Sequence, residues 1–254
     1  MVDELLDLFW SMNSLVVLCF YVVGVVVFVL EHLVGIRAAY GRYSSRSWGP
    51  LIPAPIAWFV QEAPSFFIPA IALVYSRRSF HPVLYLYLVH YALRTFVYPL
   101  LIRGGKPTPA SAALAAFAFC TINGALQTVA ASFAVDQPVT SVRFILGATV
   151  WAVGLLSNWH CDSLLRSLRA DGSTGYKIPR GGLFTYVSCG NLASESLEWL
   201  GYALAAGHAG GPWAFAFFTV ANLAPRAHHH HAHYLALFPT YASLNRKAFI
   251  PFLW

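Results

Sequence analysis

Five ionisable side chains stand inside long apolar stretches of this sequence. They are Glu62 in "AWFVQEAPSF", Arg94 in "VHYALRTFVY", Asp162 in "LLSNWHCDSLL", and Glu195 and Glu198 in "NLASESLEWLGY". A charge at the centre of a bilayer costs about 2.5–3.5 kcal/mol on insertion scales, so such groups usually face the interior of a helix bundle and mark function. The alternative is that they pair with one another and only hold helices together. Because five such groups exceed what the packing of a small bundle requires, we favour a functional site.

Glu62 and Tyr91 could act as a pair of neutral acids. Glu62 follows Gln61 in a segment rich in Trp and Phe, and a carboxyl group in apolar surroundings can stay protonated at neutral pH. Tyr91, between His90 and Arg94, is a second weak acid that we expect at a similar depth. Two neutral donors that converge on a carbonyl oxygen would stabilise negative charge there, and one such donor contributes about 2.7–4 kcal/mol. The alternative for Tyr91 is a tyrosine of the membrane interface.

The elements that must position these residues are membrane-spanning helices. The chain has 254 residues, of which 58% are apolar and 10% are charged, whereas a soluble domain carries about 25% charged residues. The apolar residues form long blocks, and each crossing of a bilayer needs roughly 20 of them. We therefore predict an all-α integral membrane protein with one domain over residues 1–254. Its seven predicted transmembrane helices lie near 11–30, 52–75, 81–102, 110–134, 144–164, 184–206 and 212–236.

The distribution of basic residues predicts the orientation of the bundle. Most Lys and Arg residues follow the first, third and fifth spans or close the chain, while Arg77, Arg78 and Arg143 lie on the opposite side. Cytoplasmic loops carry an excess of Lys and Arg, so we place the C-terminus in the cytoplasm and the N-terminus, with Asp3, outside. The net charge is +6, but it forms no extended basic run, and we predict no nucleic-acid partner.

Basic, glycine-bearing loops on the cytoplasmic side could bind a phosphorylated ligand. Arg166 and Arg169 lie at i, i+3 on one predicted helical face, and "YKIPRGG" with Lys177 follows them. The stretch "RGGKP" adds Arg103 and Lys106. Guanidinium groups grip phosphates in a bidentate manner. The sequence has neither the glycine fingerprint of a Rossmann fold nor a P-loop, and contact with lipid headgroups is the alternative use of these residues.

The stretch "RAHHHHAHYLALF" could be a metal site or a wall of a nucleotide pocket. His229 and His233 lie at i, i+4, but no carboxylate or cysteine lies nearby in the sequence. A zinc site needs further ligands, so we predict no metal. His230 and Tyr234 share another helical face beside Arg226, which favours the pocket wall.

Together these motifs resemble the steroid 5α-reductases, the 3-oxo-5α-steroid 4-dehydrogenases. The stretches that carry the resemblance run in family order from about residue 38 to the end of the chain. They include "YGR", "AWFVQEAPSF", "HYALRTFVYPLLIRGGKP", "FCTINGALQ", "NWHCDSLLRSLR", "YKIPRGGLFTYVS", "RAHHHHAHYLALF" and "RKAFIPFLW". The resemblance implies a seven-helix membrane fold that encloses a steroid and the nicotinamide of NADPH. It also implies reduction of the 4,5 double bond of a 3-oxo-4-ene steroid, with hydride added at C5 and Glu62 and Tyr91 polarising the C3 carbonyl.

The remaining site residues follow from the basic loops and the resemblance together. The residues expected to bind NADPH are Tyr40, Gly41, Arg94, Arg103, Lys106, Asn158, His160, Asp162, Arg166, Arg169, Tyr176, Lys177, Asn191, Glu195, Arg226, His230 and Tyr234. Those expected to bind the steroid are Trp58, Gln61, Glu62, Tyr91, Glu198 and Trp199. The steroid part is expected mainly in residues 1–110 and the NADPH part mainly in 140–254. Lys106 and Lys177 depart from the family pattern, which often has arginine there, and lysine lacks the bidentate fork.

Two other functions use similar residues. Related membrane reductases of polyprenols or enoyl lipids share the C-terminal half and NADPH, but the Gln61–Glu62 and His90–Tyr91 stretches favour a substrate with a ring carbonyl. A non-catalytic lipid-binding protein or transporter could use the same buried charges, although the sequence shows no repeat-related, broken helices. We expect a monomer among membrane lipids, in the endoplasmic reticulum if the host is eukaryotic and in the inner membrane if it is bacterial. The sequence does not specify the natural steroid.

Overall fold

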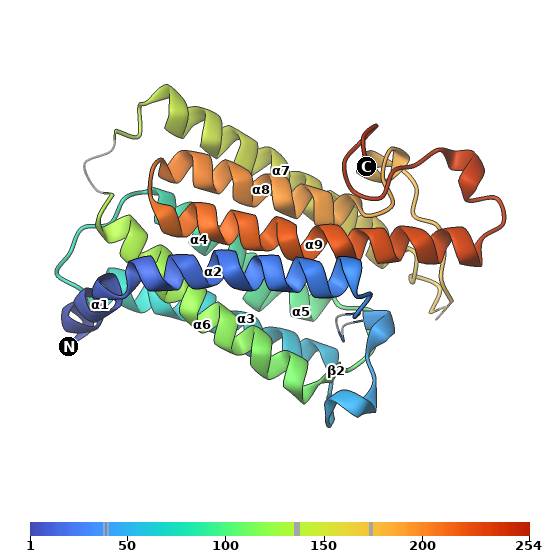
Figure 1. The fold of residues 1–254 in the computed structure, drawn as a ribbon, viewed down its shortest axis with the longest axis horizontal. Coiled ribbons are helices and arrows are strands. Elements are labelled where there is room, and N and C mark those ends of the chain that lie inside the picture. Colours follow the sequence, from blue (N-terminus) through green and yellow to red (C-terminus); the bar gives the residue numbers. More distant parts are fainter. Residues whose placement is uncertain (38, 40, 135–137, 173–174) are drawn as a thin grey trace.

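In the computed structural model, long helices run alternately up and down a single bundle (Figure 1). The structure describes residues 1–37, 39, 41–134, 138–172 and 175–254. The longer helices are α2 (Asn13–Phe28), α3 (Ala54–Tyr75), α4 (Val83–Ala92), α6 (Ala110–Ser132), α7 (Val142–Ser167), α8 (Gly190–Ala206) and α9 (Gly210–Leu237). The short helices are α1 (Val2–Ser11), α5 (Tyr98–Leu101), the π-helical turns Val29–Leu33 and Leu93–Val97, and the 3-10 turns Gly41–Tyr43, Arg46–Trp48, Gly182–Thr185 and Ala242–Leu244. Strands β1 (Leu51–Ile52) and β2 (Thr108–Pro109) form one antiparallel pair.

Each apolar segment predicted from the sequence contains a helix, but the start of one predicted helix was wrong. The helix expected at 184–206 begins at Gly190, because the preceding residues pair with the C-terminal part of the chain. The backbone N–H of Ser188 donates to the carbonyl of Lys247 at 2.8 Å, and the N–H of Lys247 donates to the carbonyl of Tyr186 at 3.0 Å. These long-range hydrogen bonds replace the first turn of the expected helix.

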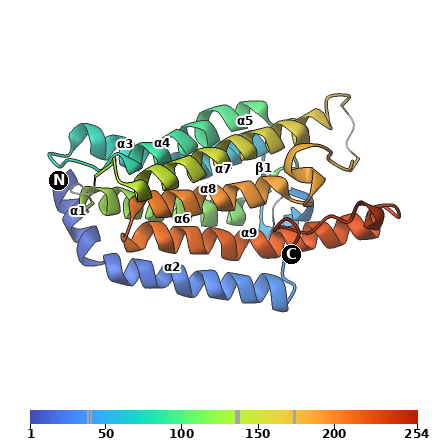
Figure 2. The ribbon, with the colours of Figure 1, turned by 90° about the horizontal axis from the view of Figure 1, so that it is seen from above.

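Four helical segments of the described chain are long and apolar enough to cross a membrane. They are Asn13–Leu33, Ala54–Tyr75, Ala110–Ser132 and Val142–Ser167. The segment that begins with α2 lies at the edge of the bundle, with α9 on one side of it (Figure 2). Its valine and leucine side chains are largely exposed, as expected of a helix that faces lipid tails. The chain is therefore a membrane protein, while the count of seven crossings stays a prediction.

A π-helical turn, Leu93–Val97, joins α4 to α5. Pro99 explains this turn, because it has no N–H group and its ring excludes the carbonyl group of Thr95 four residues earlier. The N–H of Tyr98 accordingly donates to the carbonyl of Leu93, five residues back. Single π-turns of this kind are frequent at functional sites, and this one carries Arg94.

Helices α7 and α8 pack with their backbones in contact. A Cβ atom added at Gly154 would overlap the backbone nitrogen of Glu198, and one added at Gly201 would overlap the backbone nitrogen of Trp151. Gly147 makes a third contact of this kind. Lipid tails are as apolar as the helices themselves, so helices in a membrane associate through close packing of small residues. These glycines therefore set the distance between α7 and α8.

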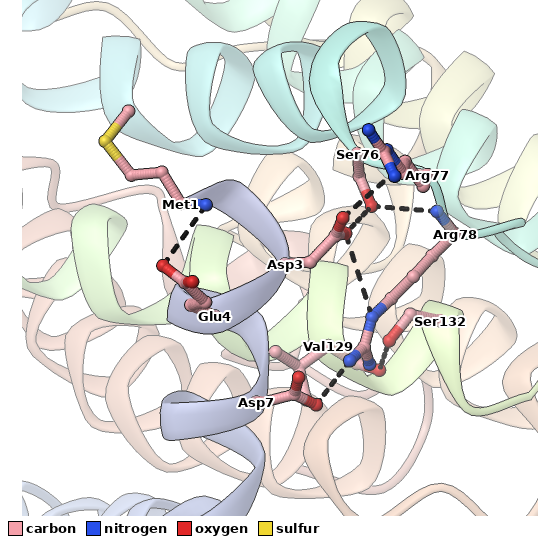
Figure 3. Close-up of polar contacts among 9 residues, drawn as sticks. All are labelled: Met1, Asp3, Glu4, Asp7, Ser76, Arg77, Arg78, Val129 and Ser132. Atoms are coloured by element: carbon pink, nitrogen blue, oxygen red, sulfur yellow. Dashed lines mark hydrogen bonds and ion pairs between the residues drawn. The ribbon is translucent and has the colours of Figure 1, made fainter.

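A short amphipathic helix that the sequence analysis did not predict, α1, crosses the end of the bundle that carries the N-terminus (Figure 2). Asp3 of this helix accepts hydrogen bonds from the hydroxyl of Ser76 and from the backbone N–H of Arg77, which follow α3 (Figure 3). The hydrogen bond from Ser76 holds the pKa of Asp3 below its usual value. Arg78 forms ion pairs with Asp3 and Asp7, so α1 is tied to the end of α3.

We predict that Gly154→Ala lowers the melting temperature of the purified protein far more than Gly210→Ala. The added methyl group at position 154 would overlap the backbone of Glu198, whereas at position 210 it would meet only the side chain of Val17, at 3.6 Å. Overpacking in a core typically costs about 1–3 kcal/mol, and more where a backbone cannot move. Size-exclusion chromatography of heated, detergent-solubilised samples measures this difference. Equal melting temperatures would contradict the backbone contact between α7 and α8.

Candidate active site

The five ionisable residues that the sequence singled out meet around Arg94. All four carboxyl groups are electrostatic neighbours of its guanidinium group, although they lie on three other helices. Glu62 comes from α3, Asp162 from α7, and Glu195 and Glu198 from α8. The structure therefore brings residues of the N-terminal and C-terminal halves of the chain into one polar cluster inside the bundle.

Arg94 is held between one carboxylate and two aromatic rings. Its Nη1 donates a hydrogen bond to Oδ2 of the buried Asp162 at 3.3 Å. Its guanidinium carbon lies 4.3 Å from the ring centroid of Tyr98 and 4.7 Å from that of Trp58. Cation–π contacts of this kind are strongest where water is excluded. The ion pair compensates the charge of Arg94, and the two rings fix its orientation.

His90 and Glu198 form the most deeply buried polar pair of the site. The Nδ1 atom of His90 lies 2.6 Å from Oε1 of Glu198, and the two residues are 3% and 0% exposed. The ring of Trp199 packs edge-on against His90, with 4.4 Å between centroids, and lies 5.8 Å from the ring of Tyr91. Trp199, predicted as a wall of the steroid pocket, is 1% exposed, so it supports His90 and Tyr91 from the core.

Glu62 lies opposite Cys120, across the contact between α3 and α6. Its Oε2 is 3.9 Å from Sγ of Cys120, and its Oε1 is 3.5 Å from Nε2 of Gln61. Tyr91 on α4 has both Glu62 and Cys120 as electrostatic neighbours. The two weak acids predicted from the sequence, Glu62 and Tyr91, therefore stand on neighbouring helices and in the same part of the bundle.

Several buried polar atoms around this cluster have no hydrogen-bond partner among the described residues. They are Nε1 of Trp58, Oε1 of Gln61, Oγ1 of Thr95, Oε2 of Glu198 and Nη1 of Arg166. Buried polar atoms in proteins are hydrogen-bonded in the large majority of cases. Their gathering here indicates a place for the polar groups of a ligand, with both donors and acceptors available.

The expected cofactor residues on α7 hold the N-terminal end of α8 and the glycine turn before it. Nδ2 of Asn158 donates to the backbone carbonyl of Asn191 at 2.9 Å. His160 packs against Gly182, where an added Cβ would lie 2.8 Å from the imidazole ring. The guanidinium carbon of Arg166 lies 5.5 Å from the ring centroid of Trp159, and its buried Nη1 has no hydrogen-bond partner among the described residues.

Two of the residues predicted to bind the cofactor, Arg169 and Lys177, have protein partners. Nη1 of Arg169 donates to the backbone carbonyls of Arg103 and Gly104, at 3.2 and 2.7 Å. The ammonium group of Lys177 pairs with Asp171 of its own loop at 2.7 Å. In this structure Arg169 therefore holds the 102–107 loop in place. Arg103 and Lys106 of that loop are exposed.

Of the residues predicted near "YGR" and "YKIP", the structure places some and not others. Tyr40 lies outside the described residues. Gly41 has φ of 54°, a left-handed conformation that glycine adopts without strain. The ring of Tyr176 packs edge-on against His233, with 5.4 Å between centroids, so α9 supports the 175–181 loop.

Histidines of the "HHHH" run tie α9 to segments that are distant in sequence. Nε2 of His229 lies 2.7 Å from the backbone carbonyl oxygen of Glu31, at the end of the first long helical segment. Nδ1 of His231 lies 2.6 Å from the hydroxyl oxygen of Ser188, just before α8. In the part of the chain that the structure describes, no three His, Cys, Asp or Glu side chains are grouped to hold a metal ion.

The predicted cofactor residues of α9 form a second group, next to the 3-10 turn Gly41–Tyr43. The ring of His230 stacks on that of Tyr43, with 6.0 Å between centroids. Tyr234 is buried and stacks on Tyr241 at 5.0 Å. Arg226 donates to Oδ1 of Asn222 at 3.2 Å. These contacts place the three residues on α9 and at the C-terminal end of the bundle, the end that also carries the basic loops (Figure 1).

Sequence reasoning did not assign three residues that the structure puts in the cluster, namely His90, Tyr98 and Cys120. A signal was present for Tyr98, which follows Arg94 at i+4 and so shares its helical face. His90 was noticed only as the neighbour of Tyr91, and Cys120 carried no signal, because their contacts depend on helices that are distant in sequence. The unassigned residues are those that orient Arg94, Tyr91 and Glu62.

The fold and the cluster together define a membrane protein with a buried polar site. In this site carboxyl groups lie beside a guanidinium group. Residues 106–254 match the family described as 3-oxo-5-alpha-steroid 4-dehydrogenase. The chain is 47% identical over 241 residues to 3-oxo-5-alpha-steroid 4-dehydrogenase 1 of Bos taurus. The aligned residues cover 91% of this chain and 92% of that protein. It is 45% identical over 227 residues to form 1 of Homo sapiens, with coverage of 86% and 87%. Form 2 of Homo sapiens is 44% identical over 232 residues, with coverage of 85% and 88%. The chain belongs to this family.

We predict that Arg169→Ala exposes the 102–107 loop to trypsin. The substitution removes two hydrogen bonds to the carbonyls of Arg103 and Gly104, and each contributes about 1 kcal/mol. Cleavage after Arg103 should become several-fold faster, while the Lys106–Pro107 bond resists trypsin in either protein. Timed digestion in detergent followed by mass spectrometry measures the rate, and Arg166→Ala is the matched control. Equal cleavage of both variants would show that Arg169 does not hold the loop.

Proposed function

We propose that this chain reduces the 4,5 double bond of a 3-oxo-4-ene steroid, such as testosterone or progesterone, to the 5α-dihydrosteroid, with NADPH as the reductant. The observation that carries the proposal is the meeting of Glu62 and Tyr91 in one enclosed polar cluster. These two residues lie in a chain that belongs to the 3-oxo-5-alpha-steroid 4-dehydrogenase family. The names of its relatives describe an enzyme with this substrate class, and the cluster offers the chemistry that the reaction needs.

Glu62 and Tyr91 would act on the C3 oxygen of the steroid. When C5 gains a hydride, the electrons of the double bond move toward C3, and the C3 oxygen gains negative charge. A protonated Glu62 and the hydroxyl of Tyr91 would each donate a hydrogen bond to that oxygen, and a proton added at C4 would complete the reduction. The surrounding apolar helices exclude water, which strengthens both hydrogen bonds.

NADPH would supply the hydride, and the residues around Arg94 fit its polar groups. The buried, unpartnered Nη1 of Arg166 suits a phosphate oxygen, and the exposed cations Arg103 and Lys106 can add charge there. The carboxyl groups of Asp162 and Glu195 can accept hydrogen bonds from hydroxyl or amide groups. This donor and acceptor set supports a nucleotide mainly in the 140–254 part of the chain and the steroid mainly in the 1–110 part.

The proposed enzyme is one domain with seven membrane crossings, an outer N-terminus and a cytoplasmic C-terminus. The loops that carry most of the Lys and Arg residues lie at the end of the bundle with the C-terminus, and the N-terminus lies at the opposite end (Figure 1). The excess of positive charge in cytoplasmic loops supports this orientation. We propose a monomer, in the endoplasmic reticulum of a eukaryotic host or the inner membrane of a bacterial one.

We predict that Glu62→Gln lowers turnover by roughly 100-fold or more, because one donor to the developing negative charge is lost or weakened. The assay supplies NADPH and testosterone or progesterone to membranes that contain the protein, and measures the 5α-dihydro product by mass and stereochemistry. Binding of NADPH to the variant should be unchanged, which serves as the control for folding. Unchanged turnover would remove Glu62 from the chemistry. Absence of product from the unaltered protein, with NADPH still bound, would move the substrate toward polyprenols or enoyl lipids.

We predict that Arg166→Ala weakens binding of NADPH by roughly 10- to 100-fold, since a hydrogen bond to a charged group contributes about 1.5–3 kcal/mol. Titration of NADPH fluorescence against the purified protein measures the dissociation constant. Arg77→Ala, at the opposite end of the bundle, is the control and should bind NADPH as the unaltered protein does. Equal affinity of the two variants would place the phosphates elsewhere.

A further inference from the structure

The short helix α1 lies at the level where the membrane-spanning segments end. The candidate span that follows it, Asn13–Leu33, has 21 residues. At a helical rise of about 1.5 Å per residue this length matches the roughly 30 Å of hydrocarbon in a bilayer. Met12, between α1 and this span, therefore stands at the boundary between lipid tails and headgroups. Helices α3 and α6 also end here, since the residues that follow them, Ser76 and Phe133, contact α1.

Aromatic and cationic side chains gather at this level. Tyr75 is the last residue of α3 and is exposed. The ring of Phe133 stacks on that of Trp10 in α1, with 3.8 Å between centroids, and the guanidinium carbon of Arg78 lies 5.3 Å from the centroid of the same ring. Trp and Tyr are enriched where a membrane meets water, and long cationic side chains extend toward the water there. These residues are typical of that interface.

One face of α1 is bound to the protein. Asp3 and Asp7 form ion pairs with Arg78 (Figure 3), and Leu6 is buried in the bundle. The helix runs across the end of the bundle (Figure 2), so its axis lies along the membrane surface when the long helices cross the membrane. The contacts with the bundle also fix which side chains of α1 face outward.

The outward face of α1 carries an apolar stripe with a polar edge. Leu5, Leu8 and Met12 follow one another at i, i+3 and i+7, and they are 60%, 59% and 46% exposed. Glu4 and Ser11 are also exposed. At 100° per residue these two polar residues lie about 80° from the middle of the stripe. The outward face is therefore divided along its length into an apolar and a polar side.

We propose that α1 is an interfacial helix that lies in the plane of the membrane surface, with Leu5, Leu8 and Met12 inserted among the lipids and the polar edge in water. Interfacial helices of this kind bury their apolar face about 5–10 Å into the boundary between headgroups and acyl chains. Lipid is the partner because the stripe continues into the lipid-facing side of α2, where Leu15 and Leu18 are each 57% exposed. A stable protein interface takes about 20–30 residues on each side, which so narrow a stripe does not offer. Through its ion pairs with the end of α3, the helix sets the depth of the bundle in the membrane.

The test places spin labels on α1 of the full chain in phosphatidylcholine vesicles. Cys19 is exposed, whereas the other three cysteines are buried, so the background is Cys19→Ser. Single cysteines then replace Leu5, Leu8, Glu4 and Ser11 in turn. Electron paramagnetic resonance compares the access of each label to molecular oxygen, which concentrates in lipid, with its access to a water-soluble nickel chelate. We expect oxygen to have several-fold better access at positions 5 and 8, and the nickel chelate at positions 4 and 11.

Two further labels and two further substitutions make the outcome decisive. Val22→Cys, in the middle of α2, is the deep reference and should exceed positions 5 and 8 in its preference for oxygen. In the Leu5→Cys protein, Leu8→Glu should shift the label toward the nickel chelate, while Ser11→Glu on the polar edge should leave it unchanged. All of these side chains are exposed, so an unchanged melting temperature is the control for folding.

Two results would overturn the proposal. If labels at positions 5 and 8 prefer the nickel chelate as much as those at positions 4 and 11, α1 stands in water above the membrane. If they are shielded from both reagents, protein rather than lipid covers the stripe, and a second copy of the chain becomes its partner.

Discussion

The backbones of α7 and α8 touch, because Gly154 leaves no side chain between its helix and the main chain of Glu198. That contact decides where the side chain of Glu198 can reach. From this position it meets His90 on α4, and the ring of His90 rests against Tyr91, with 5.0 Å between centroids. A bulkier residue at position 154 would move α8 outward and carry Glu198 away from His90. The place of a candidate catalytic tyrosine therefore depends on a glycine two helices away, which takes part in no chemistry.

Charge balance is the second constraint on the interior. One guanidinium group, that of Arg94, is surrounded by four carboxyl groups, and a buried charge without a partner is strongly destabilising. Asp162 is paired with Arg94, and Glu198 is hydrogen-bonded to His90. Glu62 contacts a thiol and an amide and, among the described residues, has no cation within ion-pair distance, so the neutral, protonated carboxyl is the form that fits its surroundings. The same form is the one that can donate to a carbonyl oxygen. The physical requirement for a stable bundle and the chemical requirement for polarising an enone thus coincide at this residue.

The sequence was enough to predict the long helices, though not α1, and to point to Glu62 and Tyr91. In lipid every backbone polar group must be satisfied within its own segment, so long apolar blocks become helices, and ionisable residues inside them stand out. The sequence could not show which of these side chains contact each other, because contacting residues such as His90 and Glu198 are 108 residues apart. The start of α8 was predicted wrongly for a similar reason, since hydrogen bonds to Lys247 hold the preceding residues away from the helix.

Each of the four consecutive histidines of α9 contacts a different part of the chain. Successive residues of an α-helix are rotated by about 100°, so four neighbours point in nearly every direction around α9. His228 stacks on Trp254, His229 meets the carbonyl of Glu31, and His230 and His231 face Tyr43 and Ser188. An imidazole ring offers both a flat apolar face and a hydrogen-bonding nitrogen, and both are used here. A phenylalanine could supply only the stacking contacts, and an asparagine only the hydrogen bonds. The run therefore connects α9, the helix that carries Arg226 and Tyr234, to four other parts of the chain.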